Sequence, residues 1–440
     1  MKARFAEVTK ELRALLRGDE AFLASFSGEE ADFARFNRGR VRQAGTVRQL
    51  FLALDLVKGR RHVTAQLTLA GEREQDRARL AATVASLRER LSFVPEDPHM
   101  LYSTDPWVSE SLGANRLPEA GAALEAIRGR GEGFDLVGIY AAGSMHSGFA
   151  SSLGHDLWSS RYTFHFDWSL YHEKDKAVKT SYAGFTWDAA GFERKFAWAR
   201  EQLAVLSKPP VTLSPGHYRA YIAPAALNDF LETLSWGGFS LKAHRTRQTP
   251  LLRMIEEGAK LHPGFTLAEN TAGGVAPAFQ AQGFPRPERV ELIGRGAYRD
   301  CLISPRSAKE YGVPTNGAQA SETPLSYDLA AGTMPQSEVL PRLERGLYIN
   351  NFWYLNYSDR PRCRVTGMTR FATFWVENGA IQAPVSVMRF DETAYRLLGE
   401  RLSALTRERE FIFDANTYGG RSQVTALLPG LLVEDLTLTL

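Results

Sequence analysis

Asn228, Asp229 and Glu232 are polar residues with a spacing that could serve chemistry, in an otherwise apolar segment at residues 225–234. A helix would place Asn228 and Glu232 on one face, which is how a helix presents two ligands to one metal ion. Asparagine is a poor zinc ligand, however, and both carboxylates are ordinary residues for a helix surface. The spacing therefore favours surface residues over a metal site.

Histidines are the second group that could hold a metal. His165 and His172 lie in an aromatic stretch with Asp167 and Glu173. In a strand His165 and Asp167 share one face, and their aromatic surroundings favour buried structural roles. Four further histidines fall in separate predicted elements, and the sequence leaves open whether any of them converge: His146, His155, His217 and His244.

A third candidate is the run of small or polar residues between two predicted strands, which contains Thr366, Gly367, Thr369 and Arg370. An extended peptide could add to an exposed sheet edge here through main-chain hydrogen bonds, and Arg370 could pair with a carboxylate. The alternative is that Thr366 and Gly367 form a bend and Arg370 a surface ion pair. We keep this run as a candidate surface for a substrate or partner.

Composition excludes several classes of function. The 440 residues include 53 basic and 50 acidic side chains, so the net charge of +3 does not indicate nucleic acid as a partner. With no basic, apolar leader and no run of about 18 apolar residues, we expect a cytoplasmic protein without a membrane partner. Cys301 and Cys363, the only cysteines, exclude a disulfide framework and are interpreted as small core residues.

The elements that would position these residues predict an α+β protein of two domains. The N-terminal domain, residues 1–208, is expected to be an antiparallel or mixed sheet covered by helices, with helices 2–16 and 72–91 on one face. Its strands are predicted to break at residues 28–30 and at Gly45. Helix 191–206 ends before a proline pair that we take as the linker.

The C-terminal domain, residues 209–440, is expected to be a β-rich sandwich or barrel-like sheet with a few helices. Asn378-Gly379 is the strongest hairpin signal, because a type I′ turn needs positive φ at both central residues. Strand 369–376 should therefore fold back on 380–387. Residues 393–406 are predicted to form an amphipathic helix, and residues 265–290 and 312–337 to be mainly loop.

Several motifs occur together in a specific order. They are FARFN (33–37), VRQ (41–43), GRGAY (294–298), SPRSAKEYG (304–312), GLYI (346–349), VTG (365–367), VENGAI (376–381) and PV (384–385). In this order they resemble the TldD/PmbA (TldE) family, once called modulators of DNA gyrase. The resemblance implies the fold of a zinc metallopeptidase, and it implies that the protein works as part of a TldD–TldE heterodimer.

Two departures from the family pattern bear on the role of this chain. The TldD branch carries H-E-x-x-x-H on a helix and a cysteine near the C-terminus as zinc ligands. The corresponding segments here, 225–234 and 414–420, contain no histidine and no cysteine. The resemblance therefore implies a TldE-like, non-catalytic subunit without a cofactor of its own, whose TldD-type partner supplies zinc for a complex acting on unfolded peptides.

Other roles stay open at this stage. The chain could be an active metallopeptidase with an altered metal site that uses His217 or His244 beside Asp229 and Glu232. It could also be a peptide-binding adaptor with no part in proteolysis. The sequence further leaves open a homodimer of the isolated chain.

Overall fold

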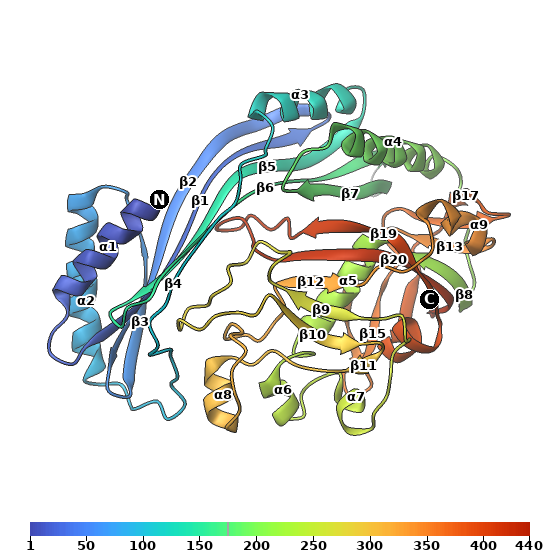
Figure 1. Ribbon diagram of the computed structural model, residues 1–440. Coiled ribbons are helices and arrows are strands. Elements are labelled where there is room, and N and C mark those ends of the chain that lie inside the picture. The colour runs from blue at the N-terminus through green and yellow to red at the C-terminus, as the bar shows by residue number, and fades with distance from the viewer. Residues whose placement is uncertain (174–175) are drawn as a thin grey trace.

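The computed structural model describes residues 1–173 and 176–440, and its first large unit is a seven-stranded sheet (Figure 1). The strand order is β3-β2-β1-β5-β6-β4, with β7 beside β6. Its strands are β1 (Ala21–Asn37), β2 (Arg40–Lys58), β3 (Arg61–Thr68), β4 (Val108–Leu112), β5 (Asp135–Ser151), β6 (Asp156–Glu173) and β7 (Lys176–Gly184). Its helices are α1 (Lys2–Leu15), α2 (Arg73–Leu91), α3 (Ala120–Gly131) and α4 (Ala189–Leu206).

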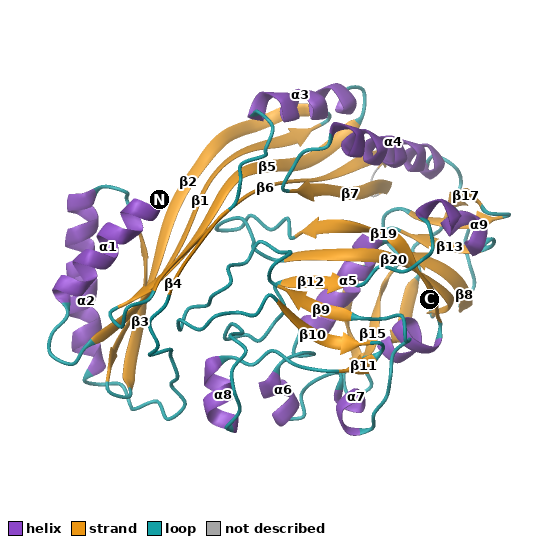
Figure 2. Ribbon diagram, in the orientation of Figure 1, coloured by secondary structure: helices purple, strands orange, loops and turns teal. Residues whose placement is uncertain are grey.

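The second unit is a thirteen-stranded sheet that surrounds helix α5 (Figure 2). Its strands are β8 (Gly216–Ile222), β9 (Leu267–Asn270), β10 (Arg289–Gly294), β11 (Ala297–Tyr298), β12 (Ser326–Leu329), β13 (Gly346–Ile349), β14 (Trp353–Asp359), β15 (Arg364–Met368), β16 (Thr373–Glu377), β17 (Ala380–Pro384), β18 (Arg389–Thr393), β19 (Leu402–Phe413) and β20 (Thr425–Leu438). Its helices are α5 (Pro224–Ser235), α6 (Leu241–Arg245), α7 (Leu252–Glu256), α8 (Pro305–Tyr311) and α9 (Val339–Leu343). The predicted α+β class is confirmed.

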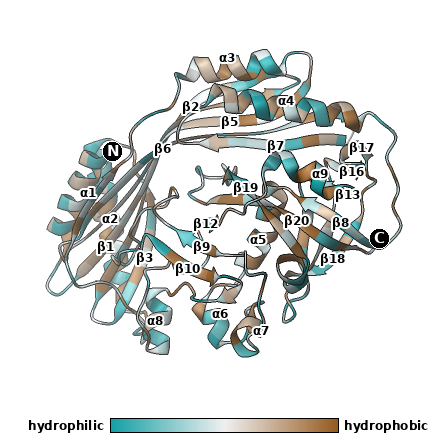
Figure 3. Ribbon diagram, turned by 45° about the vertical axis from the view of Figure 1, so that its right-hand side comes forward, coloured by the Kyte–Doolittle hydropathy of each residue, from teal (hydrophilic) through white to brown (hydrophobic). Residues whose placement is uncertain are grey.

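Helices α1 and α2 cover the same face of the first sheet, as predicted. Phe5 of α1 and Leu80 of α2 pack in one buried cluster with Phe22 and Phe26, which alternate along β1 and so point to one side. The outward surfaces of these two helices are largely hydrophilic (Figure 3). Burial of one apolar stripe per helix is what fixes both helices to the sheet.

A second buried cluster joins the two sheets. Phe166 and Trp168 of β6 pack in it together with Tyr348 of β13, Phe374 of β16 and Leu432 of β20. The connection between the sheets runs through α4 and the proline pair at residues 209–210. The division into domains at 208/209 stays a prediction, because this core draws on residues from both sides of it.

The predicted breaks within the first sheet are wrong. Gly28 lies inside β1, opposite Leu50 of β2, and Gly45 lies inside β2, opposite Phe33. A Cβ on Gly28 would lie 2.9 Å from the ring of Phe26, so this glycine leaves room for packed side chains. Glycine within a strand thus marks close packing here, as it often does.

The predicted helix at 393–406 is also wrong. Residues Arg396–Glu400 form a single π-type turn, and β19 starts at Leu402 and pairs antiparallel with β20. Leu402 and Leu405 face Val433 and Leu431 across this pair. Their spacing imitates a helix, but pairing with the long strand β20 decides the structure. Two regions expected to be loop each contain a short strand, β9 and β12, which pair with each other.

The hairpin at Asn378-Gly379 is confirmed. Both residues have positive φ, 53° and 68°, and β16 pairs antiparallel with β17 across them. The turn holds the edge strand β17 in register, and β16 pairs on its other side with β13. This places the end of the predicted family motif at the margin of the second sheet.

A histidine joins the first sheet to the loop that contacts α8. His62 of β3 lies 3.0 Å from Asp55 and 3.5 Å from Asp97, and Arg306 of α8 pairs with Asp97. The hydrogen bond with Asp55 raises the pKa of His62 in spite of its partial burial. Protonated His62 is therefore favoured in the folded chain.

We expect this contact to make stability depend on pH. Because the folded pKa is raised, the stabilisation is complete below the unfolded pKa of about 6.5 and is lost as pH rises through the folded value. Denaturant titrations at several pH values should show a slope in this window that His62→Gln removes. His172→Gln, at an exposed position of β6, is the control. An unchanged slope in His62→Gln would contradict the assignment.

Candidate functional site

Helix α5 carries the predicted polar residues on one face. Pro224 opens the helix, where proline fits because its missing N–H would be unpaired anyway. Its apolar face is buried in the main core of the second sheet through Ala226, Leu227, Phe230, Leu231 and Leu234. Asn228, Asp229 and Glu232 consequently point away from that core.

The polar residues of α5 contact one another and the chain opposite. Asn228 Nδ2 donates to Glu232 Oε1 at 2.8 Å, and the backbone N–H of Phe352 donates to Asp229 Oδ2 at 3.0 Å. Burial, together with the negative charge of Glu232, raises the pKa of Asp229 to about 7. Burial also raises the pKa of Glu232. Asp229 is therefore a carboxyl that can gain or lose a proton near neutral pH.

A cleft of about 250 Å³ opens beside this face of α5. Its walls come from α5, from Lys179 of β7, from residues 351–355 and from Phe371. A larger cavity of about 510 Å³ lies between β7, α4 and β19, and Lys179 lines it as well. The two hollows therefore share Lys179 of β7 as part of their walls.

The donor set at α5 does not fit the zinc site of the family. Asn228 and Glu232 are hydrogen-bonded to each other, and His217 and His244, the two histidines considered as replacement ligands, bond elsewhere. His217 lies 3.0 Å from Asp435, and His244 lies 2.9 Å from the Tyr298 hydroxyl. Within residues 1–173 and 176–440, no three His, Cys, Asp or Glu side chains come together as a metal would require.

His165 and both cysteines are buried in the core, in keeping with the structural roles interpreted from the sequence. His165 is buried and stacks on Phe413 with ring centroids 5.2 Å apart, and burial lowers its pKa to about 3. Burial raises the pKa of Cys301 to about 11 and that of Cys363 to about 12, so neither thiol is reactive near neutral pH.

The predicted surface at 366–370 has a different setting from the one expected. Strand β15 is not a sheet edge, because it pairs with β14 on one side and β18 on the other. Thr366 Oγ1 donates to the Phe390 carbonyl at 2.9 Å, and Thr369 is buried, where it accepts the Met388 N–H at 3.1 Å. Gly367 is buried too, and a Cβ there would lie 2.7 Å from the Phe390 ring.

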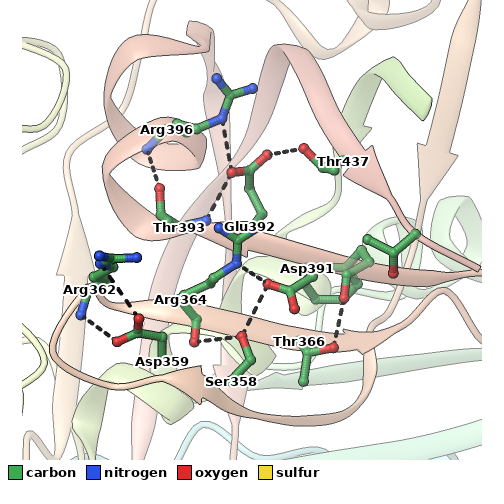
Figure 4. Close-up of polar contacts among 12 residues, drawn as sticks. Ser358, Asp359, Arg362, Arg364, Thr366, Asp391, Glu392, Thr393, Arg396 and Thr437 are labelled. Carbon is green, nitrogen blue, oxygen red and sulfur yellow. Dashed lines mark hydrogen bonds and ion pairs between the residues drawn. The ribbon is translucent and has the colours of Figure 1, made fainter. Parts of the chain in front are cut away.

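Polar side chains on either side of β15 are engaged with one another (Figure 4). Arg364 and Ser358 both donate to Asp391, at 2.5 and 3.1 Å. Arg396 and Thr437 both donate to Glu392, at 3.0 and 2.7 Å. These groups hold β14, β15, β18 and β20 together, so Arg364 and Thr366 already have roles within the sheet.

Arg370 lies close to the cleft rather than in a surface ion pair. Its guanidinium carbon is 5.0 Å from the centre of the Trp353 ring and 5.5 Å from that of Phe371. Trp353 and Phe371 both line the cleft beside α5. The structure thus connects Arg370 with the polar face of α5, while Thr366, Gly367 and Thr369 contribute to the sheet behind it. A binding role for these four residues stays a prediction.

Sequence reasoning missed the segment opposite α5. Strand β14 pairs only with β15 and is a free edge of the sheet within the described residues, and it begins at Trp353 beside the exposed Tyr354. Asn351, one residue before the Phe352 amide that binds Asp229, also lines the cleft. The run Asn350-Asn351-Phe352-Trp353-Tyr354, which places polar and large aromatic residues together in a predicted strand, was the available signal.

Comparisons with known proteins agree with this architecture. The model of the PmbA/TldA metallopeptidase C-terminal domain matches residues 215–440. TldE from Thermococcus kodakarensis has a similar structure, with a TM-score of 0.80, 15% identity and coverage of 99% of this chain and 100% of that one. A candidate modulator of a DNA gyrase from Thermotoga maritima is also similar, with a TM-score of 0.75 and 16% identity. The match covers 99% of this chain and 100% of that one. No curated protein matches.

The fold and the family model together define a metallopeptidase-related protein. The chain belongs to the PmbA/TldD metallopeptidase family. A third structure, a candidate modulator of DNA gyrase from Bacteroides thetaiotaomicron, has a TM-score of 0.72 at 15% identity and covers 99% of this chain and 98% of that one. None of the helices in the described part of the chain is long and apolar enough to cross a membrane.

Proposed function

We propose that the chain is a TldE-like subunit, without zinc or catalytic groups of its own, that completes a zinc peptidase by pairing with a TldD-type partner. The heterodimer would act on unfolded or extended peptides. The observation that carries the proposal is the donor set of α5, which we take as the counterpart of the family's metal helix and which presents Asn228, Asp229 and Glu232 where a histidine pair would be needed. The loop at 414–420, which has no cysteine, supports it independently.

The chain's contribution in this proposal is a surface for the peptide. The free edge of β14 can accept an extended backbone, so affinity comes from main-chain hydrogen bonds that read little sequence. The cleft beside α5 begins where β14 begins, at Trp353. A cytoplasmic location is part of the proposal and is supported by two cysteines that are both free and buried.

Zinc analysis of purified protein tests the proposal. The full chain should be purified alone and together with a TldD-type partner, and zinc measured by elemental analysis. We expect almost no zinc in the lone chain, about one zinc per heterodimer, and cleavage of an unfolded peptide by the heterodimer only. A chelator should abolish cleavage.

Two results would contradict it. A full zinc complement in the lone chain would show an altered but active metal site. An assembled complex that binds an unfolded peptide without cleaving it would show an adaptor instead of a peptidase subunit.

A further inference from the structure

The cleft beside α5 contains hydrogen-bond acceptors that lack donors. Only 7% of Asn351 is exposed, and its Oδ1 atom has no partner in the described part of the chain. Asn351 lines the cleft together with Asp229 and Glu232. An unpaired buried acceptor costs roughly 1–3 kcal/mol, so the Asn351 amide would gain a donor by turning toward an occupant of the cleft.

Both carboxylates have one oxygen to spare. Asp229 accepts the Phe352 N–H through Oδ2, and Glu232 accepts the Asn228 amide through Oε1. No donor to Asp229 Oδ1 or Glu232 Oε2 is found among residues 1–173 and 176–440. Lys179 lines the same cleft and its charge acts on both carboxyls, but no ion pair joins it to either of them in the described part of the chain. Two carboxylates with a spare oxygen each therefore line one cleft, beside the unpaired amide of Asn351.

The remaining walls of the cleft are aromatic. Trp236, Trp353, Tyr354 and Phe371 line it, and the ring faces of such residues attract cations. The Arg370 guanidinium lies over Trp353 and Phe371, so a cation already packs against these two rings, while Trp236 and Tyr354 have no such partner in the described part of the chain. Since the described residues place no three acidic, His or Cys ligands together, a small metal ion is a poorer fit than a larger cation with several N–H groups.

We infer that this cleft binds a protonated primary amine of a peptide, either its N-terminus or a lysine side chain. The ammonium group donates to Asp229 and Glu232, and to Asn351 Oδ1 once that side chain turns into the cleft, and its carbon chain lies against the aromatic wall. The peptide as ligand rests on the proposed function, but amine binding by this chain requires neither zinc nor the partner. In this inference, the polar residues of α5, which the proposed function takes as the counterpart of the family's metal helix, recognise substrate.

The charges around the cleft give this site a pH dependence. The charged groups that act on the Asp229 carboxyl are Glu232 on its own helix and Lys179 from β7. Glu232 is also subject to the negative charge of Asp414, which follows β19. The raised pKa of Asp229 means that ammonium binding releases its proton. Affinity for a lysine-type amine, which stays charged throughout, should therefore rise between about pH 6 and pH 8.

Three labelled peptides of the same Gly/Ser/Ala sequence test the inference on the purified full chain by fluorescence anisotropy. The first has a free N-terminus and no lysine, the second is N-acetylated with one lysine, and the third is N-acetylated without lysine. We expect at least one of the first two to bind about tenfold more tightly than the third. Which one binds identifies the source of the amine.

Variants with unchanged shape provide the residue-level test. Asp229→Asn and Glu232→Gln should each weaken amine binding about tenfold and leave the melting temperature nearly unchanged. Glu193→Gln, on the exposed side of α4, is the matched control and should bind like the unmodified chain. Equal binding of all three peptides, no binding of any, or unchanged affinity in both folded variants overturns the inference. So does stoichiometric Ca²⁺ or Zn²⁺ that displaces the amine.

The two proposals fail in distinguishable ways. A heterodimer with normal zinc content and cleavage but no preference for amines would overturn only the amine site. Zinc in the lone chain would overturn the proposed subunit role and leave the peptide-binding results to be judged separately.

Discussion

Replacing Phe230 with alanine is expected to lower the free energy of unfolding by about 3–5 kcal/mol. Phe230 is completely buried in the main core of the second sheet and is one of its largest buried side chains. The loss combines the transfer free energy of the ring with the cavity that the rigid strands around α5 leave behind. Denaturant unfolding followed by far-ultraviolet circular dichroism measures it.

Phe93→Ala is the matched control for this change, because 83% of Phe93 is exposed. We expect the same substitution there to change stability by no more than about 0.5 kcal/mol. Phe230→Leu, which keeps most of the volume, should recover most of the loss. Similar effects at Phe230 and Phe93 would mean that α5 is not anchored as the structure shows, and Asp229, its neighbour, would then have no fixed position.

Arg421→Ala is expected to cost about 2–4 kcal/mol and to release the loop before β20. Only 8% of Arg421 is exposed. Its Nη2 donates to the Thr163 carbonyl at 2.9 Å, its backbone N–H donates to Glu29 at 2.8 Å, and its guanidinium packs on Phe413. Burial lowers its pKa to about 10, so it stays charged at neutral pH.

Two measurements check the Arg421 prediction. Denaturant unfolding gives the stability, and limited proteolysis at the exposed Tyr418 reports whether the loop has been released. Arg407→Ala, whose side chain is 63% exposed and pairs with the adjacent Glu408, is the control, with an expected change within about 0.5 kcal/mol. An Arg421→Ala protein as stable and protease-resistant as this control would contradict the anchoring role.

Local patterns predicted the elements whose own residues decide their structure. The spacing of Phe5, Val8 and Leu12 indicated α1, and Asn378-Gly379 indicated the hairpin between β16 and β17. The pattern failed where a distant strand decides. Leu402 and Leu405 are spaced as in a helix, yet they lie in a strand because β20 offers them a partner. Nothing local distinguishes these cases.

The candidate site was predictable only in part for the same reason. Helical spacing correctly placed Asn228 and Glu232 on one face of α5. Lys179 and Asn351 reach the same cleft from β7 and from the segment before β14, far away in the chain. Convergence of that kind depends on how the two sheets pack, which no spacing of residues records. The prediction that the sheet has an exposed edge at β15 was wrong, because β14 and β18 pair with this strand on its two sides.

The core that joins the two sheets bears on how the chain can be made. Trp168 and Phe166 leave the ribosome long before Leu432, against which their cluster finally packs. At roughly 5–20 residues per second, synthesis of the intervening chain takes tens of seconds. During that time the first sheet can form its hydrogen bonds while part of its apolar face is still uncovered. The nascent chain thus keeps apolar surface exposed, and with it a risk of aggregation, until its last strands emerge.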